Sequence, residues 1–363
     1  MRKRDTIVLL MAGIVLLAGC QKTGPFGGKS AVSFTAVSKV GTKTAYSGVE
    51  TEEGSRKYER IDWKQGDLIR VWSDVAVHRY NKEQHWSDYI VTADGIANKR
   101  ISTASLAAQN LNNVPGDGTG NGLVWGPIGS YTFHAVYPAQ EIVASTNGRE
   151  VTTSCVIPDT QQITFVKGIG KPDMSHAYME ATATATTTIE GEGVPVTLPF
   201  KPAFTAFEIT LRSASETLYL DSFSIQSEGG SPVAGSFSIV FGHATDLFQP
   251  VSGSTQSQVT IPLNDTELSA TADLKFTVLA LPETFSDLSI TFNVKTDPTA
   301  TTYLPRTLQL KQDGEYIRFG QCIKHRLYGL ALSAETWKVL AITGEDLEWD
   351  EEVWGENIIW EEL

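Results

Sequence analysis

The sequence predicts an all-β protein built from two β-sandwich domains. Short runs of alternating apolar and polar residues recur along the chain, separated by Gly, Pro, Asp and Ser, and this spacing is typical of sandwich architecture. No long run carries the period of an amphipathic helix. The 363 residues are enough for two domains of ordinary size, and a hydrophobic content of 41% is enough to form their cores.

The first residues have the pattern of a bacterial lipoprotein signal. The basic stretch Arg2–Arg4 is followed by the apolar run Ile7–Leu17, and small residues precede Cys20. This run is shorter than the roughly 20 apolar residues that a membrane-spanning helix needs. We therefore expect a signal peptide at residues 1–19, an acylated Cys20 (carrying palmitate or a similar chain) and a flexible tether over residues 20–30.

The net charge limits the partners. The chain carries a formal charge of −13 at neutral pH. Surfaces that bind nucleic acids or anionic membranes need basic patches. We therefore expect no nucleic-acid partner, and an attachment to the membrane that depends on lipid rather than on charge.

The first expected strand is followed by a long polar segment. Ala31–Val40 alternates, with Val32, Phe34 and Ala36 on one side, and this pattern predicts a strand. Gly41–Arg60 contains several basic residues and lacks any period, so we expect it to be an exposed loop.

The rest of the N-terminal half also favours short strands. A turn at Ile61–Asp67 leads into them, a short helix is expected near Ala104–Leu111, and Asn112–Gly122 reads as a Gly-rich loop. Strands are expected at Leu68–Trp72, Trp86–Val91, Tyr131–Tyr137, Val151–Ile157 and Ala177–Thr186.

A cluster of breaker residues at Glu190–Pro195 predicts the domain boundary. The N-terminal sandwich is then expected over residues 31–193 and the C-terminal one over residues 194–363. Strands of the second half are expected at Val196–Phe200, Ala203–Leu211, Leu218–Ile225, Ala234–Phe241, Gln258–Leu263, Leu274–Leu281, Leu288–Val294, Thr307–Leu310, Tyr316–Phe319, His325–Leu332 and Trp337–Ile342.

The C-terminal segment 345–363 combines acidic residues with large apolar ones. It carries nine acidic residues and no Lys or Arg. An acidic tail without aromatic residues would be disordered, whereas this one has apolar groups at strand spacing and needs a surface to pair with. Pairing within its own chain and pairing with another chain both remain open. The candidate anchors of such a strand are Leu347, Trp349, Val353, Ile358 and Trp360.

No pattern of catalytic or metal-binding residues occurs. The six histidines form no compact ligand set, and nucleophile elbows, Walker motifs and dinucleotide glycine motifs are absent. Cys155 and Cys322 lie far apart, which favours two buried free thiols over a disulfide. We therefore expect no enzyme activity, no cofactor and no metal site.

Five further segments, taken in order after the signal at Cys20, resemble the fimbrillins of Bacteroidales, which are lipoprotein pilins. Each is a strand with a turn and is weak alone, but together they span nearly the whole chain. The segments are Val32–Ala36, Lys43–Tyr46, Ile61–Val71, Phe200–Phe207 and Lys324–Leu330.

The resemblance implies two tandem sandwiches of the transthyretin type and assembly into a type V pilus at the surface of the outer membrane. In such pilins a trypsin-like protease cuts behind the first strand, and a strand of a neighbouring subunit replaces it. Partners would be other fimbrial subunits, the outer membrane through the lipid, and a receptor on a host or bacterial surface. The best-known members are cut after Arg, whereas here the nearest positions are Lys; the candidate cut sites are Lys43, Lys39, Arg56, Lys57 and Arg60.

A second hypothesis is a glycan-binding surface lipoprotein. Exposed aromatic rings stack on sugars, and Trp72, Trp86 and Trp125 are the candidates. Large aromatic residues are mostly buried, so core packing is the competing interpretation for all three.

Overall fold

The computed structural model describes residues 29–38, 46–53, 56–98, 101–109, 122–145, 150–242, 248–285, 288–310, 317–319, 323–333, 340–341 and 358–359. Strands dominate these ranges, which confirms the all-β class; their one helical turn is the short 3-10 element η1 (Met174–His176). In the described part of the chain no helix is long and apolar enough to cross a membrane. The expected signal peptide and Cys20 lie outside these residues.

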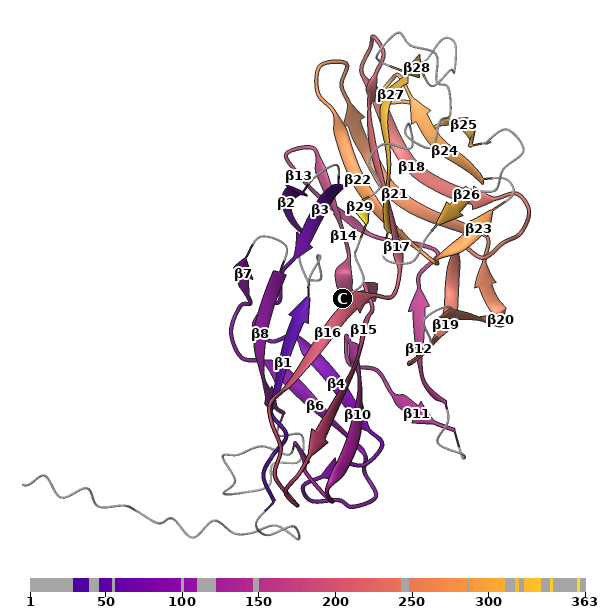
Figure 1. The fold of residues 1–363 in the computed structure, drawn as a ribbon. Helices are drawn as coiled ribbons and strands as arrows, with labels where there is room; N and C mark the ends of the chain where they lie inside the picture. Colours follow the sequence, from indigo (N-terminus) through magenta and orange to yellow (C-terminus); the bar gives the residue numbers. More distant parts are fainter. Residues whose placement is uncertain are drawn as a thin grey trace, which may run out of the picture.

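A first sheet closes on itself into a barrel. Its order is β1-β16-β15-β10-β4-β6-β8-β7, and β1 also pairs with β8, so that seven strands form a ring to which β7 is added. We call this ring the first barrel (Figure 1, indigo to magenta). The strands of the whole sheet are β1 (Phe34–Ser38), β4 (Leu68–Ser73), β6 (Trp86–Val91), β7 (Ile96–Asn98), β8 (Ile101–Ala108), β10 (Gly129–Tyr137), β15 (Met179–Thr187) and β16 (Val196–Pro202).

A second part of the molecule, which we call the second lobe, contains three sheets around a larger core. The seven-stranded sheet holds β13 (Ile163–Val166), β14 (Ile169–Pro172), β17 (Thr205–Ser213), β22 (Leu274–Ala280), β27 (Ile323–Leu332), β28 (Leu340–Ala341) and β29 (Ile358–Ile359). A four-stranded sheet holds β18 (Leu218–Ser227), β21 (Gln258–Leu268), β24 (Leu288–Lys295) and β25 (Leu304–Leu310). Another holds β11 (Ile142–Ala144), β12 (Val151–Ile157), β19 (Ala234–Val240) and β20 (Phe248–Gln256).

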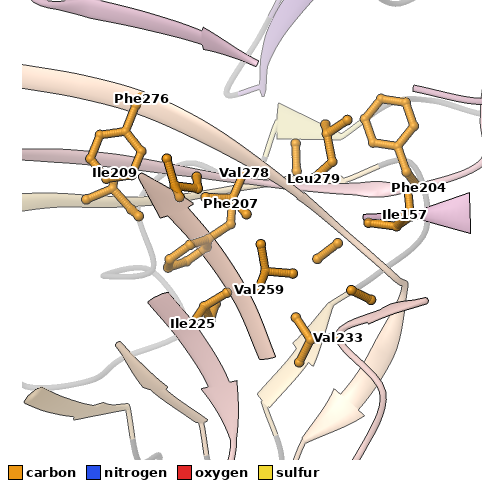
Figure 2. Packing of buried hydrophobic residues seen from close by; sticks show 14 of the residues in the cluster. Ile157, Phe204, Phe207, Ile209, Ile225, Val233, Val259, Phe276, Val278 and Leu279 are labelled. Carbon is orange, nitrogen blue, oxygen red and sulfur yellow. The ribbon is translucent and has the colours of Figure 1, made fainter. Parts of the chain in front are cut away.

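Alternating burial builds the core of the second lobe. In β21 and β18 every second residue is buried near the middle of the strand, because one face of each sheet packs inward. Phe223 of β18 and Phe276 of β22 meet edge to face across the layers, with ring centroids 5.2 Å apart. Figure 2 shows the packing of Ile157, Phe204, Phe207, Ile209, Ile225, Val233, Val259, Phe276, Val278 and Leu279.

Three two-stranded ribbons complete the described strands. They pair β2 (Tyr46–Glu53) with β3 (Arg56–Ile61), β5 (Val77–His78) with β9 (Leu123–Val124), and β23 (Glu283–Phe285) with β26 (Ile317–Phe319).

Two local predictions are wrong. The segment expected to be an exposed loop, Gly41–Arg60, contains the antiparallel ribbon β2–β3. Its charged residues conceal the pattern because a two-stranded ribbon need not bury one face. The short helix expected near Ala104–Leu111 is instead strand β8, which lies between β6 and β1 and takes its conformation from those partners rather than from its Ala content.

Strand pairing runs across the predicted domain boundary at residues 193 and 194. β16 follows that boundary, yet it pairs with β1 and β15 of the first barrel. β12 precedes it, yet it pairs with β19, and Cys155 of β12 belongs to the second core. Cys155 is a buried free thiol, as expected, whereas Cys322 lies outside the described residues. The division into two transthyretin-like sandwiches stays a prediction.

A stack of rings joins the first barrel to the second lobe. The ring of His134 on β10 lies 5.7 Å from that of Trp72 and 5.0 Å from that of Phe241, measured between centroids. Trp72 and Phe241 both contact the second core. The His134 Nδ1 lies 3.0 Å from the Thr182 hydroxyl. His134 is 7% exposed, and this burial lowers its pKa to about 4 although Asp74 acts in the opposite direction.

We expect His134 to make the protein acid-sensitive. In the unfolded chain its pKa returns to about 6.5, so between pH 6.5 and 4 only the unfolded state takes up the proton. Stability is therefore complete above pH 6.5 and falls as the pH drops to 4, by on the order of 3 kcal/mol at most. Urea unfolding at pH 7, 5 and 4 measures this loss. In a His134→Gln control the loss over this interval should be smaller, and equal losses in the two proteins would contradict the assignment.

The strand that closes the first barrel

β1 is the strand through which the first barrel closes. It pairs in parallel with β16, with Phe34 opposite Val196 and Ala36 opposite Leu198. Its other edge pairs antiparallel with β8, where Ala36 lies opposite Ala104. Because both edges of β1 are hydrogen-bonded, its removal would leave two unpaired edges at once. We call the space between β8 and β16 that residues 32–38 fill the β1 slot.

The inward side chains of this segment are fully buried. Val32 and Phe34 are 3% exposed, and Ala36 and Ser38 are 0% exposed. The ring of Phe34 meets the rings of Tyr89 and Phe133 edge to face, at centroid distances of 4.9 and 5.2 Å. Such pairs contribute about 0.5–1.5 kcal/mol beyond the burial of area. The β1 slot is therefore an apolar site shaped for alternate residues of one strand.

Tyr89 also holds the wall of the β1 slot in place. Its hydroxyl accepts a hydrogen bond of 2.9 Å from the backbone N–H of Leu123. Burial raises the pKa of Tyr89, so the hydroxyl stays protonated. The next residue after Leu123, Val124, forms a β-bridge to Ala31, which leads into β1.

Backbone hydrogen bonds fix the residues that precede β1. Ser30 donates from its N–H to the carbonyl of Gly191 at 2.8 Å, and its own carbonyl accepts from Trp125 at 3.1 Å. Val32 donates to the carbonyl of Leu123 at 2.9 Å. The chain therefore enters the barrel at the end formed by the loops around residues 123–126 and 191.

The candidate cut sites fall into two groups. Lys39 and Lys43 directly follow β1 and lie outside the described residues. Arg56, Lys57 and Arg60 lie in β3, paired with β2, rather than in the expected loop. A cut after Lys39 or Lys43 would detach β1 and leave the β2–β3 ribbon whole, whereas a cut after Arg60 would take β2 away as well. Proteases favour unpaired chain, so the second group, which lies in a paired strand, is a poor substrate.

One of the five candidate anchors of the tail is described. Ile358 belongs to β29, which pairs antiparallel with β27 of its own chain, opposite Lys324. The tail can thus pair within its own chain, one of the two alternatives left open by the sequence. Leu347, Trp349, Val353 and Trp360 lie outside the described residues.

Each of the three candidate tryptophans packs its ring against another side chain. Trp125 is 1% exposed and packs against Tyr131, which confirms core packing for this residue. Trp72 stacks on His134. The guanidinium of Arg70 lies 4.0 Å above the ring of Trp86. Burial therefore leaves Trp125 no ring face for stacking on a sugar, whereas Trp72 and Trp86 are half-buried and each has a contact on one ring face.

The sequence did not point to the residues that line the β1 slot from across the barrel. Tyr89 and Phe133 lie in expected strands, but local patterns do not say which strands face each other. Ser102 and Ala104 of β8 were placed in or before a helix. Their even spacing, with small side chains pointing inward, is the signal that could have identified β8 as a strand.

Comparisons with known proteins give likenesses to solved structures. No protein-family model matches the chain, and no curated protein matches it. The structure is similar to a candidate cell adhesion protein from Bacteroides ovatus (TM-score 0.48, 13% identity, covering 84% of this chain and 92% of the other). It is also similar to a candidate cell adhesion protein from Bacteroides uniformis (0.45, 14%, 85% and 93%) and to a fimbrial assembly protein from Parabacteroides distasonis (0.38, 10%, 82% and 90%).

Proposed function

We propose that this protein is a structural and adhesive subunit of a surface fimbria and that it is assembled by strand replacement. The observation that carries the proposal is the position of β1. This five-residue strand lies at the N-terminal end of the described chain, has both edges paired and buries an apolar face. One cut behind it would release it from the barrel without breaking any other described strand.

The physical consequence of that cut supports assembly between copies. Loss of β1 would expose the rings of Tyr89 and Phe133 and the backbone groups of β8 and β16. Exposed apolar surface and unpaired strand edges are both relieved by an added strand. A C-terminal strand of a neighbouring subunit is the proposed donor.

Attachment through the lipid determines where on the cell the protein is assembled. In this proposal Cys20 is acylated and holds the uncut precursor at the outer membrane, on the cell surface. The cut then detaches the acylated residue together with β1, so lipid attachment and barrel closure end in the same step. Other fimbrial subunits and a receptor on a host or bacterial surface are the proposed partners, and no enzymatic activity is proposed.

Limited proteolysis tests this function. We expect a trypsin-like protease to cut the purified full-length precursor after Lys39 or Lys43 and to produce a ladder of polymers on a denaturing gel run without heating. The Lys39→Gln/Lys43→Gln double variant should stay uncut and monomeric under the same conditions. A protein that remains monomeric after clean loss of β1 would contradict the proposal.

A further inference from the structure

The β1 slot sets a rule for any strand that replaces β1. Four inward positions, those of Val32, Phe34, Ala36 and Ser38, are at most 3% exposed. A charged side chain at any of them would be buried without a partner, at a large cost in free energy. The last two positions hold small residues, and the neighbours of Ala36 are Ala104 and Leu198 across the two edges. Larger residues there would overpack the barrel.

The residues after β27 contain few stretches that fit this pattern. Within 333–363, only two seven-residue segments, which we call windows, have uncharged residues at all four alternate positions. One window places Trp337, Val339, Ala341 and Thr343 inward, and the other places Val353, Gly355, Asn357 and Ile359 inward. Every window that includes both Leu347 and Trp349, or both Ile358 and Trp360, places at least one Glu inward.

A size rule follows, namely that small residues must take the places of Ala36 and Ser38. Read in the direction of β1, only the first window meets it. Ala341 takes the place of Ala36, and Thr343 takes the place of Ser38 as a small hydroxyl residue. The second window would bury the amide of Asn357 at the place of Ala36 and the larger Ile359 at the place of Ser38. Reversing the first window puts Trp337 at the place of Ser38, which overpacks that end. Reversing the second window buries the polar amide of Asn357 at the apolar place of Phe34.

The polarity of the first window agrees with the topology. β1 is parallel to β16, which ends at Pro202 just before β17 leads into the second lobe. Ser38 therefore lies toward the second lobe, and Val32 lies toward the opposite end of the molecule. β27 is parallel to β17, with Leu332 opposite Ser213. The C-terminal end of β27 therefore lies at the end of the second lobe away from the first barrel (Figure 1).

A donor strand that keeps the polarity of β1 must therefore come from a subunit beyond the end of the barrel where Val32 lies. The segment after Leu332 begins at the opposite end of its own subunit. Subunits joined in this way stand head to tail, and such a contact can repeat along a filament.

We propose that the β1 slot accepts residues 337–343 of a second copy of this chain, in the register that places Ala341 where Ala36 lies. This inference rests on the proposed strand replacement and specifies its donor. The acidic tail 345–363 is then not the segment that fills the slot. Within its own chain, the described residues of the donor segment, Leu340 and Ala341 of β28, pair with Ala331 and Leu330 of β27.

A disulfide between copies tests the register. Ala36 lies opposite Ala104 of β8, so the donor's Ala341 should take that position. In the full-length Ala104→Cys/Ala341→Cys variant, protease treatment followed by mild oxidation should give covalently linked multimers, and mass spectrometry should find residue 104 joined to residue 341. The Ala104→Cys/Trp349→Cys variant is the matched control for the tail, and the unaltered chain gives the background of its own cysteines.

The outcomes separate this inference from the proposed function. Polymers in which residue 104 links to residue 349, or to neither position, would overturn the donor assignment and leave strand replacement intact. Clean loss of β1 without any polymer would overturn both. A link between 104 and 341 in the cut protein only, and not in the uncut precursor, supports both.

A charge at the critical position gives a second measurement. Ala341→Glu should lower the rate of polymer formation more than about a hundredfold, because the carboxylate would be buried at the place of Ala36. Trp349→Glu, a charge of the same sign in the tail, should change the rate less than about twofold. The unfolding midpoint of each uncut variant shows whether its monomer is intact, and equal rates for the two variants would overturn the proposal.

Discussion

Replacing Phe34 with Ala should lower the free energy of unfolding of the uncut protein by about 3–5 kcal/mol. Phe34 is 3% exposed and meets the rings of Tyr89 and Phe133 at 4.9 and 5.2 Å. Its truncation removes both contacts and leaves a cavity inside a closed barrel, whose other strands cannot move together to fill it. Urea unfolding of the full-length chain measures the loss.

The same strand supplies the control for Phe34→Ala. Thr35 points away from the core and is half-buried, so Thr35→Ala should cost less than about 1 kcal/mol. Because Phe34→Ala weakens the hold on β1, it should also speed polymer formation after the cut, whereas Thr35→Ala should not. Equal unfolding free energies for the two variants would mean that β1 contributes little to closing the barrel.

Replacing Arg70 with Met should cost about 3–5 kcal/mol, because it leaves the carboxylate of Asp88 buried and unpaired. The Arg70 Nε lies 2.6 Å from one oxygen of Asp88, and Nη2 lies 2.8 Å from the other. The side chain of Asp88 is 4% exposed and that of Arg70 is 19% exposed. The guanidinium also covers the ring of Trp86, so the variant loses a cation–π contact as well.

An exposed ion pair with a similar distance gives the matched control. Lys64 and Asp94 approach to 2.7 Å, but their side chains are 43% and 59% exposed. Lys64→Met should therefore cost about 0–1 kcal/mol, since water solvates the remaining carboxylate. Thermal and urea unfolding of both variants compare the two sites. If Arg70→Met were as mild as Lys64→Met, the Asp88 carboxylate would have to be hydrated in the folded protein.

Strands that bury one face could be predicted from the sequence, and pairings between distant strands could not. Trp86–Val91 and Val151–Ile157 were predicted with the bounds that the structure has, and β1 was predicted around its centre. The alternation of burial along each strand is a local property that the chain itself displays. The parallel pairing of β1 with β16, about 160 residues away, has no local signal, because register between distant strands depends on the whole fold.

The candidate site divides in the same way. The inward residues of β1 follow from their alternation, and the position of Lys39 and Lys43 behind β1 follows from their order in the chain. The walls of the slot do not follow from the sequence: Ala104 came from a segment that its Ala content made look helical, and Leu198 came from beyond the predicted domain boundary. The size rule at Ala36 depends on both walls, so it could be recognised only in three dimensions.

The first residue of the protein in surface polymers shows whether β1 is removed before assembly. Fimbriae sheared from cells can be separated into subunits, and the first residue of the subunit can be determined by N-terminal sequencing and mass spectrometry. If β1 is removed before assembly, the subunit should begin at Val40 or Thr44, directly after Lys39 or Lys43. A subunit in the polymer that still begins at an acylated Cys20 would retain β1 and would contradict assembly by its replacement.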